Sequence, residues 1–346
     1  MNKSIEGAFY KYVRGFLTVY LPRNKCYSIN TIKAYRDTIN LFRFFLLDQK
    51  KITFTKITFD MISHDSVYEF LEWLQSSRSC SISTRNQRLA ALKSFLHYCA
   101  MEEPSLTAIY MDIQEITALR DTKKRVSYMS QKALKSILAQ PNVKNKFDLR
   151  NRFFMIIMYD TGGRIQEILD LKLRDISLDM DIPCIYLTGK GNKVRAVPLM
   201  EKTVLHLKEY LKVFHPTDSK NNNDNLFYTV IKGKKGAMSP DNVSLFIKKY
   251  AEQARFSCAE VPQKVHAHLF RHSRAMHLYQ SGIPLSYIKD FLGHESSTTT
   301  SIYASADTTM IRDALEKAAK LDSNSNTEIP VWEDNEEMIL KLCGLK

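Results

Sequence analysis

The sequence predicts a mainly α-helical protein that is divided into two domains and carries one small β-hairpin. In the first third, apolar residues recur at alternating spacings of three and four, the period of a helix with one buried face. Farther along, alternating β-branched and apolar residues flank a Gly-Lys-Gly-Asn turn at residues 189–192, which predicts the hairpin. The length of 346 residues is typical of about two domains.

Three helices are expected in the first domain, residues 1–118. The first follows Ser28-Ile29-Asn30, a good capping environment, and the second covers residues 65–75. The third begins near Ser83 and ends before Pro104, which cannot continue a helix. Its apolar residues share one side, and the basic residues predicted to be exposed on it are Arg85, Arg88 and Lys93.

A polar, basic stretch at residues 119–126 separates the two patterned regions, and we interpret it as an interdomain linker. A charge run of this kind is usually a solvated segment, but it could equally lie against an anionic partner.

The second domain is expected at residues 127–321 and to mix α and β structure. Ser130 is a candidate N-cap, and an apolar helix at 153–159 runs into Thr161-Gly162-Gly163. The other expected elements are helices at 131–138, 165–171, 240–255, 271–281 and 284–291, and strands at 182–187 and 194–199. A tail at 322–346 follows, with a polar spacer and a short apolar segment.

The charge balance is strongly basic: 50 Lys and Arg against 37 Asp and Glu give a net charge of +13. Such a balance suits a nucleic acid, because each neutralised phosphate releases counterions and adds affinity. Acidic proteins and membrane surfaces remain alternatives from charge alone.

The six cysteines are scattered and include no Cys-x-x-Cys pair, which indicates reduced, packed thiols rather than a disulfide framework. Neither a secretion signal nor an apolar run long enough to span a membrane is expected. These features favour a cytoplasmic protein.

Several residues have the chemistry needed to hold a phosphodiester. An anionic phosphate repels nucleophiles, so cations must gather around its non-bridging oxygens, and the planar guanidinium of arginine can bind them bidentately. Arg164 follows a Gly-Gly break at the start of a helix, and Arg271 stands three residues after His268. Either arginine alone is most often a surface residue, but these contexts make both candidates.

Tyr303, nine residues after His294, is the candidate nucleophile. A free tyrosine has a pKa of about 10, so it needs nearby cations and a base to react at neutral pH. His268 is the candidate base, and Lys190 at the hairpin tip is the candidate acid for the leaving oxygen. The alternative for Lys190 is a solvated turn lysine, while His294 could hydrogen-bond the phosphate.

Five of the nine histidines fall between His266 and His294, which raises the alternative of a metal site. Metallohydrolases normally add carboxylates or cysteines to such clusters, whereas here the neighbours include arginine, which repels a cation. The Gly-Lys-Gly turn also lacks the spacing of a phosphate-binding P-loop. We therefore expect no metal and no nucleotide cofactor.

The series of motifs resembles that of the tyrosine recombinases, or phage-integrase family, of the Xer type. Residues 28–35 and 83–89 are similar to the helical core-binding domain of that family. The other matching segments are Thr161-Gly162-Gly163-Arg164-Ile165-Gln166-Glu167, the Gly189–Arg195 hairpin, His268-Leu269-Phe270-Arg271-His272, Leu292-Gly293-His294 and Tyr303. Gly163, Phe270 and Ser273 depart from the usual residues, which bears on packing rather than on chemistry.

The resemblance implies that Arg164, Lys190, His268, Arg271 and His294 surround a scissile phosphate and that Tyr303 forms a 3′-phosphotyrosyl link. Glu167 matches an acidic position that supports this site. The covalent link conserves the energy of the broken bond, so neither ATP nor metal is implied.

The resemblance also implies a C-shaped clamp on double-stranded DNA, with a helical core-binding domain and a mixed α+β catalytic domain. Four protomers would act on two recombination sites, and an accessory protein is an open possibility. The linker would then lie along DNA, and the tail would dock on a neighbouring protomer or fold back on its own domain. The candidate DNA contacts are Arg85, Arg88, Lys93, Lys193 and Arg195.

Two rivals to a site-specific recombinase or integrase, carried by a mobile element or not, remain open from sequence. A type IB topoisomerase-like enzyme shares the active-site chemistry but does not exchange strands. A non-catalytic DNA-binding regulator derived from a recombinase would have lost one of the reactive residues.

Overall fold

The computed structural model describes residues 9–121, 126–216, 221–231, 233–294, 300, 303 and 336–342. The chain divides into two compact units, Met1–Lys123 and Lys124–Lys346. The boundary falls inside the stretch 119–126, of which residues 122–125 lie outside the described part.

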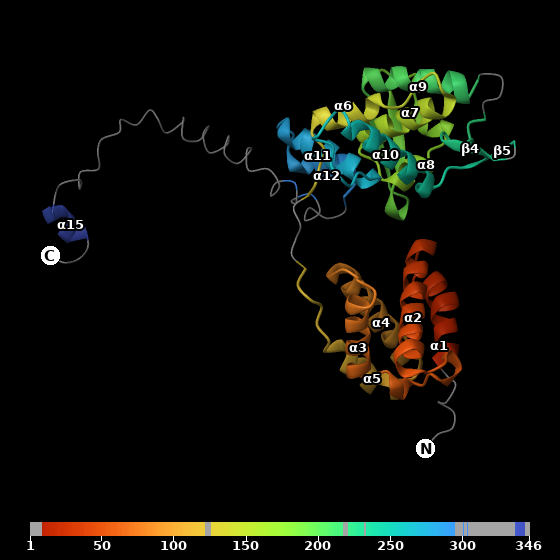
Figure 1. Cartoon of the computed structure of the whole chain (residues 1–346), viewed down its shortest axis with the longest axis vertical. Coiled ribbons are helices and arrows are strands. Elements are labelled where there is room, and N and C mark those ends of the chain that lie inside the picture. The colour runs from red at the N-terminus through yellow and green to blue at the C-terminus, as the bar shows by residue number, and fades with distance from the viewer. Residues whose placement is uncertain are drawn as a thin grey trace. The chain divides into compact units, whose positions relative to one another are not determined.

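Unit 1 is made of helices (Figure 1). Its elements are α1 (Phe9–Gly15), a π-helical turn (Phe16–Asn24), α2 (Ile29–Lys50), α3 (His64–Ser76), α4 (Ile82–Glu102) and α5 (Thr107–Gln114), with short 3₁₀ turns at Phe54–Lys56, Phe59–Met61 and Pro104–Leu106. Ser28 caps α2 through a hydrogen bond from the amide of Thr31, as its sequence predicts. The three predicted helices are confirmed as α2, α3 and α4, whereas α1, the π-helical turn and α5 were not predicted.

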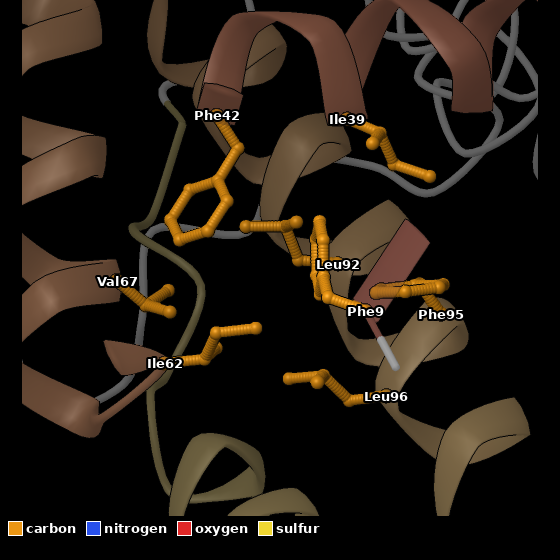
Figure 2. Close-up of a pocket in the computed structure, with 8 residues that line it drawn as sticks. All are labelled: Phe9, Ile39, Phe42, Ile62, Val67, Leu92, Phe95 and Leu96. Carbon is orange, nitrogen blue, oxygen red and sulfur yellow. The ribbon is translucent and has the colours of Figure 1, made fainter. Parts of the chain in front are cut away.

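The core of unit 1 is rich in aromatic rings and contains one small void. Eight apolar side chains surround a cavity of about 10 Å³ and point toward one another, as Figure 2 shows. Helices α1, α2, α3 and α4 all contribute to its walls. The void is about the size of one water molecule and is lined only by carbon, so it is a packing defect rather than a ligand site.

Unit 2 is built around helix α7 (Lys146–Thr161), whose main packing partners in the described part of the chain are five other helices (Figure 1). These are α6 (Gln131–Ala139), α8 (Ile165–Leu169), α9 (Glu201–Phe214), α10 (Pro240–Arg255) and α11 (Ala267–Gln280). Helix α12 (Leu285–Leu292) packs on α11, and a last helix, α15 (Glu336–Leu342), lies in the tail. The rest of the predicted tail, 322–346, is outside the described residues.

Two small antiparallel sheets complete the part of unit 2 that the structure describes. β1 (Ile176–Ser177), β2 (Cys184–Thr188) and β3 (Val194–Pro198) form one sheet in that order, with Ile185 opposite Val197. β4 (Tyr228–Ile231) pairs with β5 (Lys234–Ala237) in the other. The predicted hairpin is confirmed as β2–β3, while α9, β1 and the second hairpin were not predicted.

The mainly α-helical fold class is confirmed, with differences at the ends of elements. α7 begins at Lys146 rather than at 153, because Asn145 caps it through the amides of Phe147 and Asp148. None of the helices in the described ranges combines the length and the apolar character needed to cross a bilayer.

Candidate active site

A buried carboxylate, Glu167, organises two arginines in unit 2. Arg164 occupies the N-cap position of α8, and Glu167 lies in the first turn of that helix. The two oxygens of Glu167 lie 2.7 Å from Nη1 of Arg164 and 2.6 Å from Nη2 of Arg195 on β3. Burial by itself raises the pKa of Glu167, but the hydrogen bonds and positive charges of Arg195 and Arg164 outweigh it and hold that pKa below its usual value.

Three arginines converge on the C-terminal end of α12. The last carbonyls of a helix have no partner within the helix, and here arginines from three different segments take them. The pairs are Arg195 with the carbonyl of Phe291 (3.1 Å), Arg271 with that of Leu292 (2.8 Å) and Arg164 with that of Gly293 (3.1 Å). The three guanidinium groups are thereby held next to His294.

Two glycines allow the C-terminal ends of α7 and α12 to lie close together beside the arginines. Gly162 ends α7 and Gly293 ends α12, both with positive φ, of 58° and 65°. The carbonyl of Gly162 accepts a second hydrogen bond from Arg271, at 2.7 Å. A Cβ atom on Gly162 would lie 2.8 Å from a methyl group of Leu292, so a larger residue would push α7 and α12 apart.

Tyr303 is fully buried, and its hydroxyl lies 3.0 Å from Nδ1 of His272. Its ring packs in a small apolar cluster with Met276 of α11 and Leu292 of α12, among others. Burial raises the pKa of Tyr303, and the positive charge of Arg271 opposes this rise in part.

The histidines around the arginines are held in their neutral form. Burial, reinforced by the positive charge nearby, lowers the pKa of His272 to about 4 and that of His294 to about 4. His268 as a whole residue is exposed, but partial burial and the charge of Arg271 lower its pKa as well. Burial and the charge of Arg164 lower the pKa of Arg271 itself to about 10.

Most of the predicted catalytic residues therefore lie in one region of unit 2. Arg164, Arg271 and His294 meet at the end of α12, and Glu167 fixes Arg164 there. The Lys190 backbone is at the tip of the β2–β3 hairpin, but its side chain is outside the described part. Lys193 is exposed on the same turn.

His272 is the residue that the sequence reasoning left without a role. It follows Arg271 in the quoted motif and lies four residues after His268, so both rings project from the same side of α11. Their centroids are 5.5 Å apart. Helical spacing was the signal that could have found His272.

The five histidines do not gather as metal ligands. Among the described residues, no three His, Cys, Asp or Glu side chains come together in an arrangement that could hold a metal ion. Independence of metal stays a prediction.

The basic residues predicted to be exposed on α4 are not free, and for Arg85 the prediction is wrong. Arg85 is 2% exposed and lies under the ring of Tyr68. Arg88 is half-buried and donates to the carbonyl of Ala34 at 3.1 Å, which ties α4 to α2. Lys93 is also half-buried, and its ammonium caps the end of α5 through the carbonyls of Gln114 (2.9 Å) and Ile116 (2.7 Å).

Comparison with known families agrees with the geometry of the site. Residues 127–310 match the phage integrase family, and residues 15–103 match the N-terminal SAM-like domain of phage integrases. The chain belongs to the phage integrase family. The predicted resemblance to tyrosine recombinases is confirmed, and with it the class of enzyme, a site-specific recombinase that breaks and rejoins DNA.

Relatives of known type cover most of the chain. Tyrosine recombinase XerC of Halalkalibacterium halodurans is 28% identical over 313 residues, which span 88% of this chain and 95% of the relative. Tyrosine recombinase XerD of Staphylococcus saprophyticus is 27% identical over 297 residues, spanning 85% and 93%. The crystal structure of the XerH site-specific recombinase bound to its difH substrate superposes with a TM-score of 0.61 at 25% identity and covers 86% of this chain and 83% of XerH.

Proposed function

We propose that this recombinase cuts double-stranded DNA at a specific recombination site by attack of Tyr303 on the scissile phosphate, which forms a 3′-phosphotyrosyl bond. The contact between the Tyr303 hydroxyl and His272 is the observation that carries the proposal. It places the hydroxyl beside α11, the helix that also carries His268 and Arg271. A nucleophile from another segment thus lies beside one turn of α11 that carries a cation and a neutral imidazole.

The surrounding residues fit the charges of such a reaction. Arg164 and Arg271 bind the non-bridging oxygens, and His268 and His294 donate hydrogen bonds to them. The side chain of Arg164 is 36% exposed, so it can receive an incoming phosphate without a large movement. Glu167 holds Arg164 and Arg195 in place, and Lys190 supplies the proton for the leaving 5′-oxygen.

Tyr303 is fully buried, so the phosphate reaches its hydroxyl only after local rearrangement. We propose that binding of the recombination site provides the free energy for this step. Exchange between two duplexes cuts four strands, and each chain brings one Tyr303, so the working complex is a tetramer on two sites. Lys193, exposed on the hairpin turn, is a DNA contact. The described cysteines are unpaired thiols, and we place the enzyme in the cytoplasm.

A trapping experiment tests the role of Tyr303. The full chain is incubated in EDTA with fragments of its source genome or with supercoiled plasmid, and the reaction is quenched with detergent. We expect a protein–DNA adduct on the 3′ side of the break, whose DNA can be sequenced to locate the recombination site. Tyr303→Phe should abolish the adduct, whereas the matched control Tyr287→Phe, an exposed tyrosine on α12, should retain it.

The outcomes also separate the rival functions. An adduct that survives in Tyr303→Phe would show that another residue is the nucleophile. Relaxation of plasmids without exchange of strands between two mapped sites would favour a type IB topoisomerase-like enzyme. Specific binding without cleavage would favour a non-catalytic regulator.

A further inference from the structure

The hydroxyl of Tyr303 and the ring of His272 form a closed pair inside unit 2. The oxygen and Nδ1 are 3.0 Å apart, and the two rings meet edge to face with centroids 5.9 Å apart. A neutral histidine carries one ring proton, so a His272 that accepts from the hydroxyl at Nδ1 carries its own proton on Nε2. This is the arrangement of a nucleophile with an adjacent base.

His268 lies on the same side of α11 as His272 but differs from it in exposure. It stands one turn earlier on α11 and is exposed, whereas His272 is half-buried and faces Tyr303. The outer histidine is therefore open to an incoming phosphate, and the inner one is already in contact with the attacking atom.

We propose that His272, rather than His268, orients Tyr303 and accepts its proton during attack on the phosphate. The assignment rests on the proposed role of Tyr303 as nucleophile. The O–H bond of Tyr303 breaks and its proton moves to Nδ1 of His272, while the oxygen bonds to phosphorus. The bond from phosphorus to the 5′-oxygen breaks, and that oxygen takes a proton from Lys190. His268 binds the phosphate.

The charges around His272 make this step depend on the substrate. The groups that face it are His266, His268 and Arg271 on its own segment, His294 after α12, and Tyr303. Arginine charge in this set opposes a positive charge on His272. A bound phosphate offsets that charge, so the imidazole becomes a stronger base once DNA is in place.

The test uses the DNA site mapped by the trapping experiment, with either oxygen or sulfur at the 5′-bridging position of the scissile phosphate. Sulfur leaves without a proton, so this substrate needs the base but not the acid. His272→Asn keeps an amide near the position of Nδ1, which can hydrogen-bond to Tyr303 but cannot take up its proton. His268→Asn is the matched comparison on the same side of α11.

With His272 as the base, the wild-type rate of adduct formation should rise with pH as His272 loses its proton. We expect His272→Asn to slow adduct formation by about 100-fold or more on both substrates and to abolish this rise. His268→Asn should weaken phosphate binding but keep that rise. Lys190→Ala should form the adduct slowly on the oxygen substrate and at a restored rate on the sulfur substrate. Imidazole added to His272→Ala should restore part of the rate, with a pH dependence that follows imidazole.

Other results overturn the assignment. If His272→Asn formed the adduct at the wild-type rate, His272 would not be the base. The same would follow if the slow rate of His272→Asn on the oxygen substrate were restored on the sulfur substrate. If thermal melting shows that His272→Asn is misfolded, the imidazole experiment with His272→Ala decides. Failure of imidazole to restore any of the rate would then refute the proposal. An adduct in Tyr303→Phe would instead overturn the proposed function.

Discussion

Replacement of Glu167 by glutamine tests how the arginines of the site are held. Four hydrogen bonds join the Glu167 carboxylate to Arg164 and Arg195, at 2.6–3.2 Å, and its side chain is 4% exposed. Removing one partner of a buried ion pair costs about 3–5 kcal/mol, and glutamine keeps part of the hydrogen bonding, so we expect a loss of about 3 kcal/mol. In a domain of about 200 residues this lowers the melting temperature by about 6–12 °C.

Scanning calorimetry of the full chain measures this change. Unit 1 has its own core and provides an internal reference, and Glu209→Gln, at an exposed side chain on α9, is the matched control with an expected change within about 0.5 kcal/mol. The folded pKa of Glu167 is depressed, so its contribution is complete above its unfolded pKa of about 4.3 and is lost as the pH falls through the folded value. An equal effect of both substitutions at pH 7 would refute the reasoning.

Three further predictions concern burial. In the absence of DNA, nitration followed by mass spectrometry should modify Tyr287, which is 69% exposed, and spare Tyr303; modification of Tyr303 at an equal rate would contradict its burial. Burial raises the pKa of the Cys99 thiol, so a thiol reagent at pH 8 should label exposed Cys26 in the native protein and Cys99 only after unfolding. Val67→Ile should fill the void of unit 1 (Figure 2) and stabilise that unit by about 0.5–1 kcal/mol in calorimetry, whereas a lower melting temperature would mean overpacking.

Local signals in the sequence were sufficient for much of the fold. Ser28 and Ser130 were recognised as caps because a hydroxyl before an apolar periodic stretch satisfies free amides at a helix start. Helix α9 has no capping side chain, but Leu207, Tyr210 and Phe214 recur at helical spacing and are buried, so its periodicity was sufficient to predict it. The π-helical turn could not be predicted from the sequence, because Pro22 lies within it and proline normally interrupts a helix.

Burial of a charged side chain was not predicted, because its charge was given more weight than its position on the helix. Arg85 was predicted to be exposed, yet it stands four residues before Leu89 on the apolar side of α4 and is 2% exposed, with its guanidinium against the ring of Tyr68 of α3. Tyr303 was recognised by its distance from His294, but its burial depends on α11 and α12 together. Motif spacing therefore predicted which residues lie together in unit 2 better than it predicted which groups each of them contacts.

The contacts at the end of α12 give the Leu292-Gly293-His294 motif a role beyond its histidine. The backbone carbonyls of Leu292 and Gly293 accept hydrogen bonds from Arg271 and Arg164, which come from two other segments. A guanidinium has five donors, so each arginine can keep its carbonyl and still offer N–H groups to a phosphate. The positive φ at Gly293 ends the helix where these carbonyls become available. The protein itself thus holds both arginines in place, and in the reaction we propose, DNA binding has to change only the access of the phosphate to Tyr303.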